Sequence, residues 1–88
     1  LTSIRASATT APVGSTIIID VNLGGTSIFT TNLLTIDATE KTSVTAATAA
    51  NITTTALTDD GEITVDIDQI GSTTAGTGIK IYLIGTRT

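Results

Sequence analysis

The side chains with the greatest capacity for chemistry are five carboxylates in the second half of the chain: Asp59, Asp60, Glu62, Asp66 and Asp68. Calcium takes about six to eight oxygen ligands, and loop carboxylates can supply some of them. The spacing does not match the helix–loop–helix calcium motif, however, and Asp66 and Asp68 lie two apart on a predicted strand, so they point in parallel. We therefore interpret the cluster as a solvated face and predict no metal site.

Glycoside hydrolysis is the second chemistry that paired carboxylates suggest, because it uses two of them roughly 5–9 Å apart. Asp66 and Asp68 can meet that distance. Sugar sites also rely on aromatic platforms, and this chain has one Phe and one Tyr. The chain has no His and no Cys, which excludes the Ser/His/Asp and Cys/His nucleophile systems, disulfides and zinc–thiolate sites. We predict that the protein is not an enzyme and binds no cofactor.

Two other short motifs carry little weight. The small-residue stretch 71–78 (GSTTAGTG) lacks the Lys of a phosphate-binding loop and precedes a predicted strand, where such a loop needs a helix. Residues 51–53 (NIT) match the glycosylation sequon, which arises easily by chance in a Thr-rich chain.

Charge and hydropathy exclude further classes of partner. The net charge is −4, and the four basic residues are scattered at Arg5, Lys41, Lys80 and Arg87. Because nucleic-acid binding needs a basic patch, we predict no nucleic-acid partner. No apolar run approaches the roughly 20 residues of a membrane span, so we predict no membrane association. A chain of 88 residues buries a modest core, and oligomerisation is the common remaining source of stability.

The elements that must position these side chains are strands. Threonine fills 22 positions and isoleucine 13, and β-branched residues suit a pleated sheet. In residues 16–22 (TIIIDVN), Ile17, Ile19 and Val21 alternate onto one face. Residues 23–25 (LGG) predict a hairpin turn, with a returning strand at 26–31 that places Ile28 and Phe29 on opposite faces.

Further strands are predicted along the rest of the chain. The clearest is 62–69 (EITVDIDQ), with Ile63, Val65 and Ile67 inward, and in 79–84 the inward residues are Ile79, Ile81 and Leu83. Segment 44–55 is interpreted as extended strand plus loop, with a short helix as the alternative. Other predicted segments are a strand at 4–8, a turn at 11–14, a strand at 33–36, a polar loop at 37–43 and a turn at 58–61. We predict a single all-β domain over residues 1–88, an antiparallel β-sandwich of six to eight short strands with jelly-roll-like topology.

Two isoleucines lie on the outward faces of otherwise well-patterned strands, namely Ile18 and Ile84. Either both faces of these strands are partly covered within one sandwich, or the two side chains contact a neighbouring subunit. We single them out as a possible subunit interface.

Two stretches, 5–29 and 57–84, together resemble a small β module of tailed-bacteriophage structural proteins. In that family an Ala-Pro-x-Gly turn precedes an aliphatic strand that ends in Asp-aliphatic-Asn, followed by a Gly-containing hairpin and Ile-Phe. A later stretch reads Asp-x-aliphatic-Thr-Val-Asp-aliphatic-Asp-Gln-aliphatic-Gly-Ser. The matching residues here are Ala11, Pro12, Gly14, Asp20, Asn22, Gly25, Ile28, Phe29, Asp60, Thr64, Val65, Asp66, Asp68, Gln69, Gly71 and Ser72. Leu23 and Gly24 depart from the polar residues that are common in that hairpin.

The resemblance implies a non-enzymatic role on the virion surface, as a capsid decoration (cement) protein or a fibre module. It further implies a homotrimer that docks on the major capsid protein or another virion protein. The alternative is a bacterial cell-surface β-sandwich repeat, such as an adhesin or surface-layer domain, which high threonine and low charge also fit. A carbohydrate-binding module is a third hypothesis and would need Tyr82 as its aromatic contact.

Overall fold

In the computed structural model, which describes residues 3–29, 32–57 and 60–86, the chain is built almost entirely from β-strands. The described residues form β1 (Ser3–Ser7), β2 (Ile17–Leu23), β3 (Thr26–Ser27), β4 (Leu34–Ile36), the 3-10 turn η1 (Ser43–Thr45), β5 (Ile63–Gln69) and β6 (Lys80–Ile84). Every strand pairing is antiparallel, so the predicted all-β antiparallel fold is confirmed. None of the described helical segments has the length and apolarity needed to cross a membrane.

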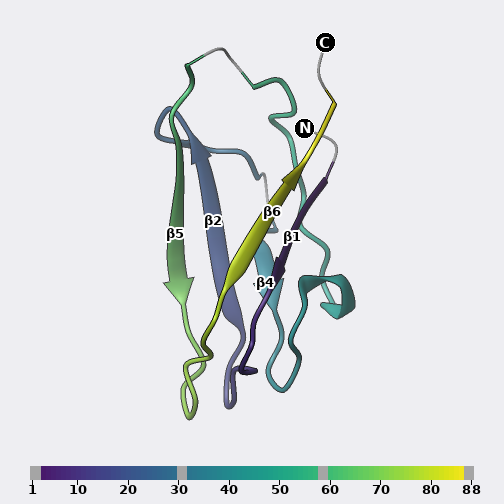
Figure 1. Ribbon diagram of the computed structural model, residues 1–88, viewed down its shortest axis with the longest axis vertical. Helices are drawn as coiled ribbons and strands as arrows, with labels where there is room; N and C mark the ends of the chain where they lie inside the picture. The colour runs from purple at the N-terminus through teal and green to yellow at the C-terminus, as the bar shows by residue number, and fades with distance from the viewer. Residues whose placement is uncertain (1–2, 30–31, 58–59, 87–88) are drawn as a thin grey trace.

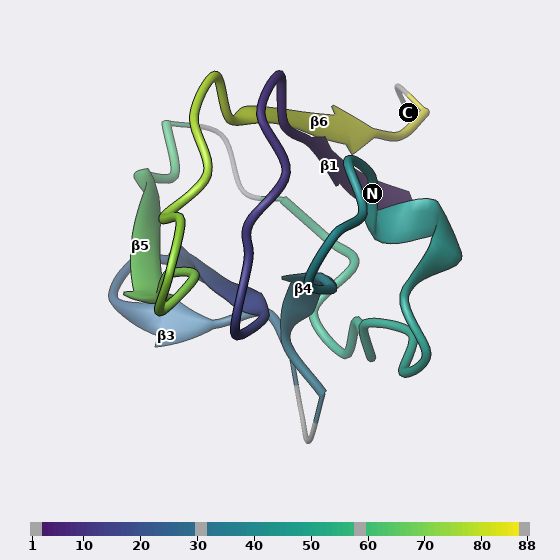
Figure 2. The same cartoon turned by 90° about the horizontal axis from the view of Figure 1, so that it is seen from below.

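The strands form two sheets, which face each other as the layers of a sandwich (Figures 1 and 2). One sheet contains β1 and β6, and the other is centred on β2. Strands β3 and β4 pair with the two ends of β2 along one of its edges. Strand β5 pairs with Ile18–Leu23, which includes residues of β2 that already pair with β3 and β4, so β5 must lie along the opposite edge of β2. The first strand thus pairs with the last, and the second with the last but one. This nested pairing is typical of a jelly roll, as predicted.

Strand β2 carries the centre of the core. Its inward side chains Ile17, Ile19 and Val21 are at most 1% exposed, whereas Ile18 and Asp20 on the other face are partly exposed. The period of two in the sequence therefore translates directly into the burial pattern of this strand.

The hairpin after β2 is also confirmed, with both central residues in the left-handed region: Gly24 has φ of 60° and Gly25 has φ of 88°. Two positive φ angles define a type I′ turn, which matches the twist of paired strands. The returning strand β3 covers two residues of the predicted 26–31, of which 30 and 31 lie outside the described residues. The Ile28 amide still donates to the Val21 carbonyl of β2 at 2.9 Å. Ile28 and Phe29, expected on opposite faces, are both buried.

The buried apolar side chains among the described residues all come from the first 36 positions: Ile4, Ala6, Ala8, Ile17, Ile19, Val21, Ile28, Phe29, Leu34 and Ile36. The second half contributes only partly buried side chains to this core, namely Ala50, Ile52, Ile79 and Ile81. Burial is therefore concentrated on the β1–β2–β4 side of the sandwich.

The two sheets are closer on that side than on the other. The buried residues Ala6 of β1 and Ala8 just after β1 are small, and some Cα atoms of β1 lie within 8 Å of Cα atoms in β4. No Cα atom of β6 lies within 8 Å of one in β2 or β5. Because large inward side chains hold sheets about 10 Å apart, alanines on one side and isoleucines on the other make the sandwich wedge-shaped.

One end of the sandwich is closed by two loops that hydrogen-bond to each other. The Val13 amide donates to the Thr74 carbonyl at 2.9 Å, and the Thr73 amide donates to the Val13 carbonyl at 2.8 Å. Further along, the Thr9 amide donates to the Thr77 carbonyl at 2.9 Å. The predicted turn at 11–14 and the predicted small-residue loop at 71–78 therefore form one joint structure.

The Thr/Ala-rich segment 44–55 contains no strand, so the prediction of an extended strand there is wrong. It begins in η1, whose first turn is capped by the Thr42 hydroxyl accepting from the Val44 amide at 3.2 Å. After η1 the chain follows an irregular path, with a single bridge between Ile52 and Phe29. Short polar side chains that bond their own backbone compete with sheet pairing, which explains this outcome.

Candidate interaction surfaces

Three inward-facing side chains of β5 are not covered by the opposite sheet. Their register partners on β2 establish the direction in which they point: Ile67 lies beside Ile19 and Val65 beside Val21. Ile63, Val65 and Ile67 are nevertheless 40%, 43% and 46% exposed. They face inward as predicted, but the expectation that they form core is wrong. Among the described residues the opposite sheet consists of β1 and β6, and no Cα atom of either strand lies within 8 Å of one in β5.

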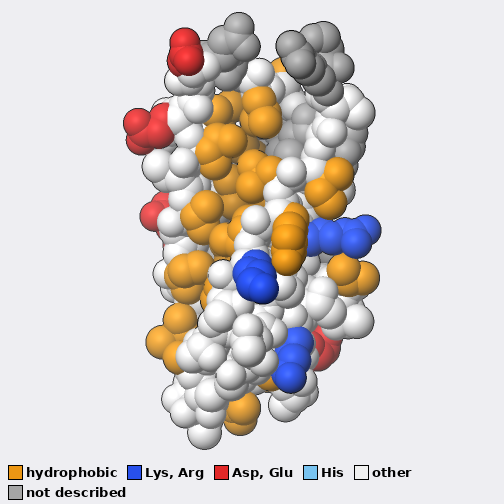
Figure 3. Space-filling model, in the orientation of Figure 1, with side chains coloured by type: hydrophobic (Ala, Val, Ile, Leu, Met, Phe, Trp, Pro, Cys, Tyr) orange, Lys and Arg blue, Asp and Glu red, His pale blue; other side chains and the backbone are white. Residues whose placement is uncertain are grey.

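We call the strip formed by Ile63, Val65 and Ile67 on β5, with Leu83 across it on β6, the open seam. Leu83 is 37% exposed although it pairs with buried Ile4. Figure 3 shows a band of apolar side chains along the face between β5 and β6, with acidic side chains along its left margin. The accessible surface of the chain is 5253 Å², against about 4,800 Å² expected for a monomer of this mass. The excess agrees with a sandwich that is open on one side.

Strand β5 is also the edge of its sheet. All seven of its residues are exposed, and among the described residues its only strand partner is β2. Ile18 pairs with Gln69 while Ile19 pairs with Ile67, so Asp68 is the extra residue of a bulge. A bulge and charged side chains on an edge strand hinder uncontrolled pairing with other chains.

The carboxylates along β5, namely Glu62, Asp66 and Asp68, form what we call the acidic margin of the open seam. Asp66 lies directly opposite Asp20 on the outer face of the sheet. Asp66 Oδ2 accepts from Asn22 Nδ2 at 3.0 Å, and Asp20 Oδ1 accepts from Ser27 Oγ at 2.6 Å. The described residues include no group of three or more metal-ligating side chains. Asp59, part of the acidic cluster in the sequence, lies outside the described residues.

The outer face of the β1–β6 sheet carries the opposite charge. Because Ala6 and its register partner Ile81 point inward, Arg5 and its partner Tyr82 point outward. Lys80 and Ile84 alternate onto the same outer face. We call this surface the basic face; Tyr82 is 48% and Ile84 42% exposed. It is hollowed by a cavity of about 420 Å³ lined by Arg5, Ala6, Ser7, Thr42, Val44, Tyr82 and Ile84.

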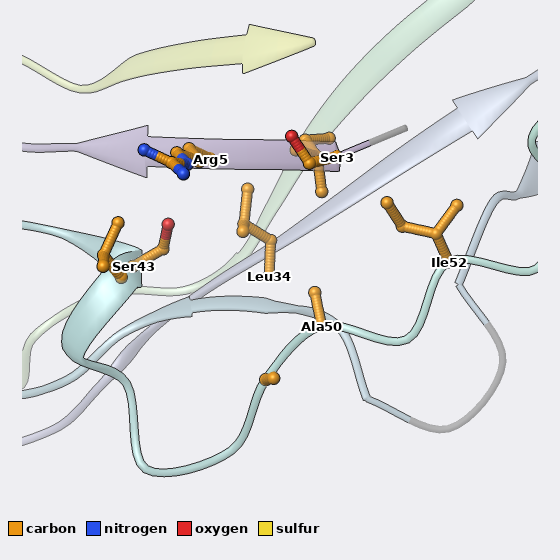
Figure 4. A pocket seen from close by; sticks show the side chains of 9 residues that line it. Ser3, Arg5, Leu34, Ser43, Ala50 and Ile52 are labelled. Atoms are coloured by element: carbon orange, nitrogen blue, oxygen red, sulfur yellow. The ribbon is translucent and has the colours of Figure 1, made fainter. Parts of the chain in front are cut away.

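A second cavity, of about 320 Å³, lies beside the other edge of β1 (Figure 4). Ser3, Arg5, Leu34, Ala50 and Ile52 line it, together with Ile4, Ser43, Val44 and Ala49. The Ser43 hydroxyl at its margin is already used, because it accepts from the Ala6 amide at 2.9 Å. Arg5 is the single charged residue in this lining. The cavity offers an apolar hollow and no acid–base pair.

The two isoleucines predicted at a subunit interface lie on different sheets. Ile18 is on the outer face of β2, where it is partly buried, and Ile84 is on the basic face of β6. The outer faces of two packed sheets point in opposite directions, so these side chains do not form one patch within a chain. Their role at an interface remains a prediction. The open seam was missed because its residues have the same alternation as an ordinary core strand.

No family model, no curated protein and no solved structure matches this chain.

Proposed function

We propose that this chain is a non-enzymatic structural protein of the virion surface, a capsid decoration (cement) or fibre module. In this proposal it assembles as a homotrimer and docks on the major capsid protein or another virion protein. The proposal rests on the family resemblance of residues 5–29 and 57–84 and on one structural observation. That observation is the open seam, which leaves inward-facing aliphatic side chains of β5 at 40–46% exposure.

Exposed apolar strips of this kind support an assembly role, because monomeric soluble proteins rarely expose contiguous apolar patches unless the patch binds something. The seam is rigid, since every residue of β5 from Ile63 to Gln69 except the bulged Asp68 is held in register by β2. A rigid surface loses little conformational entropy on docking. Such a surface suits repeated, weak contacts better than it suits a reaction.

The mechanism we propose is mechanical. Each copy would bridge neighbouring coat or fibre subunits, and many weak contacts would gain strength through multivalency. The net charge of −4 would keep the protein soluble and away from packaged DNA.

The test is binding to the particle. Purified, fluorescently labelled protein is mixed with particles of the phage whose genome encodes the chain, after removal of the native copies, and the particles are sedimented. We expect saturable cosedimentation that excess unlabelled protein abolishes, and electron cryomicroscopy should then show the protein at regular lattice or fibre positions. Absence of binding together with saturable binding to intact bacterial cells would overturn the proposal in favour of a cell-surface module.

A further inference from the structure

We propose that the open seam of one copy is covered by the basic face of a second copy, in a head-to-tail contact. This inference deepens the proposed assembly role and rests on it, since it names the partner of the seam. The occupant is another copy of this chain because one molecule carries two surfaces that complement each other in hydropathy and in charge.

The apolar parts of the two surfaces are matched in kind. The seam presents Ile63, Val65 and Ile67 as a strip of aliphatic side chains that are 40–46% exposed. The basic face presents Tyr82, Ile84 and Val44 around the 420 Å³ hollow, and Val44 is 63% exposed. Aliphatic side chains packed against a hollow lined by an aromatic ring would bury apolar surface at the centre of an interface.

The charges on the two surfaces are opposite. Glu62, Asp66 and Asp68 lie along β5, whereas Arg5 and Lys80 lie on the outer face of the β1–β6 sheet. Figure 3 shows acidic side chains at the left margin of the apolar band and Lys and Arg side chains toward its right, where one acidic side chain also lies at the lower right. The carboxylates of the β5 region and the basic residues of the β1–β6 sheet therefore lie on different parts of the surface, and opposite charges across an interface steer association and select the partner.

Charge also decides between the two ways in which identical chains can meet. A two-fold contact places each surface against the same surface of the second copy. A contact between two open seams would bring two acidic margins together, and a contact between two basic faces would bring Arg5 and Lys80 of one copy close to Arg5 and Lys80 of the other. Like charges opposite each other are destabilising. A head-to-tail contact places the acidic margin against the basic face every time. Such a contact leaves one seam and one basic face unused at the ends until a ring closes.

The first test substitutes three exposed valines that lie on different parts of the surface. Val65→Thr changes the seam, Val44→Thr changes the basic face, and Val13→Thr is the matched control, because Val13 is 38% exposed and lies on the turn at 11–14. Threonine keeps the shape and the strand preference of valine, so all three variants should fold. In sedimentation equilibrium we expect the dissociation constant for self-association to rise about five-fold for Val65→Thr and for Val44→Thr, and to stay unchanged for Val13→Thr.

The second test reverses charges. Lys80→Glu should weaken self-association roughly three- to ten-fold in low salt, whereas Lys41→Glu, which makes the same change in net charge outside the β1–β6 sheet, should have a smaller effect. Combining Lys80→Glu with Asp66→Lys in one chain should restore association, since the charge pair is re-formed in the opposite sense. All of these differences should shrink in about 1 M NaCl, where the Debye length is about 3 Å.

Three results would overturn the inference: a protein that stays monomeric at every accessible concentration, equal losses for Val65→Thr and Val13→Thr, or a two-fold dimer that Lys80→Glu does not weaken. These outcomes are separate from the test of the proposed function. A monomer that still cosediments with particles would remove the head-to-tail contact alone, and an oligomer that binds no particle would remove the virion role alone.

Discussion

Ile19 and Ile67 lie side by side on the inward face of the same sheet, yet they should respond very differently to truncation. They are register partners across β2 and β5, and they point toward the same interior. Ile19 is 0% exposed, whereas Ile67 is 46% exposed. We predict that Ile19→Ala destabilises the isolated chain at least twice as much as Ile67→Ala.

The magnitude follows from what each substitution removes. Replacing Ile by Ala deletes three carbon atoms, which is about 2.4 kcal/mol of transfer free energy at full burial. Ile19 also leaves a cavity in packed surroundings, so we expect about 3–4 kcal/mol for Ile19→Ala. Ile67 is a little over half buried and water fills the space that it leaves, so we expect about 1.3 kcal/mol.

The assay is urea unfolding followed by far-ultraviolet circular dichroism, repeated at the lowest usable protein concentration and at a much higher one. At low concentration the two free energies of unfolding should differ as described. At high concentration the cost of Ile67→Ala should grow if a second copy covers the seam, because oligomerisation stabilises the folded state by mass action. Equal costs for the two substitutions at the lowest concentration would refute the reasoning, since Ile67 would then be buried within one chain.

Four further substitutions test local features of the fold. Gly25→Ala should cost about 1 kcal/mol, because φ is 88° while no atom lies within 4 Å of the added Cβ; a neutral result in thermal melts would contradict the I′ turn. Gly71→Ala should cost clearly more than Gly25→Ala, because its Cβ would clash with the Thr74 carbonyl oxygen and the closed end of the sandwich would have to move; the reverse order of melting temperatures would contradict the packing of the two loops. Ser43→Ala should cost about 1–2 kcal/mol, because the Ala6 amide loses its acceptor, and amide hydrogen exchange at Ala6 should speed up; unchanged exchange would exclude the bond. Asp66→Asn should raise the urea midpoint of unfolding slightly in low salt and not in high salt, because it removes the charge repulsion between Asp66 and Asp20 and keeps an oxygen that accepts the Asn22 hydrogen bond. A lower midpoint would show that the two carboxylates do not repel each other.

The sequence predicts well those features that depend on neighbouring residues. The alternation of Ile17, Ile19 and Val21 sets both the existence of β2 and its buried face, and Gly24 with Gly25 sets the position of the hairpin. These features are local, because the period of two and the left-handed turn conformation are properties of a few consecutive residues. The end of β3 after Ser27 was not predictable in the same way, since it depends on where Ile28 and Phe29 find space in the core.

The candidate surface is the part that sequence reasoning could not reach. Alternation indicates which way Val65 points, but its burial depends on whether a strand of the other sheet lies opposite, which is a property of the topology. The available signal was indirect. Ala6 and Ala8 alternate in the predicted strand 4–8, and Ile79, Ile81 and Leu83 alternate in the predicted strand 79–84; small residues on one strand with large ones on the next predict sheets that diverge.

The nested pairing has a consequence for how the protein is made. Among the described strands β1 is translated first, and the strand that pairs with it, β6, is translated last, with Ser3 opposite Ile84. At synthesis rates of about 5–20 residues per second, β1 waits several seconds with an open edge before that partner emerges. The β2-centred sheet can form earlier, since β5 is translated before β6. Strands that are far apart in the sequence pair slowly. The β1–β6 sheet should therefore be the last part of the nascent chain whose amides become protected from hydrogen exchange.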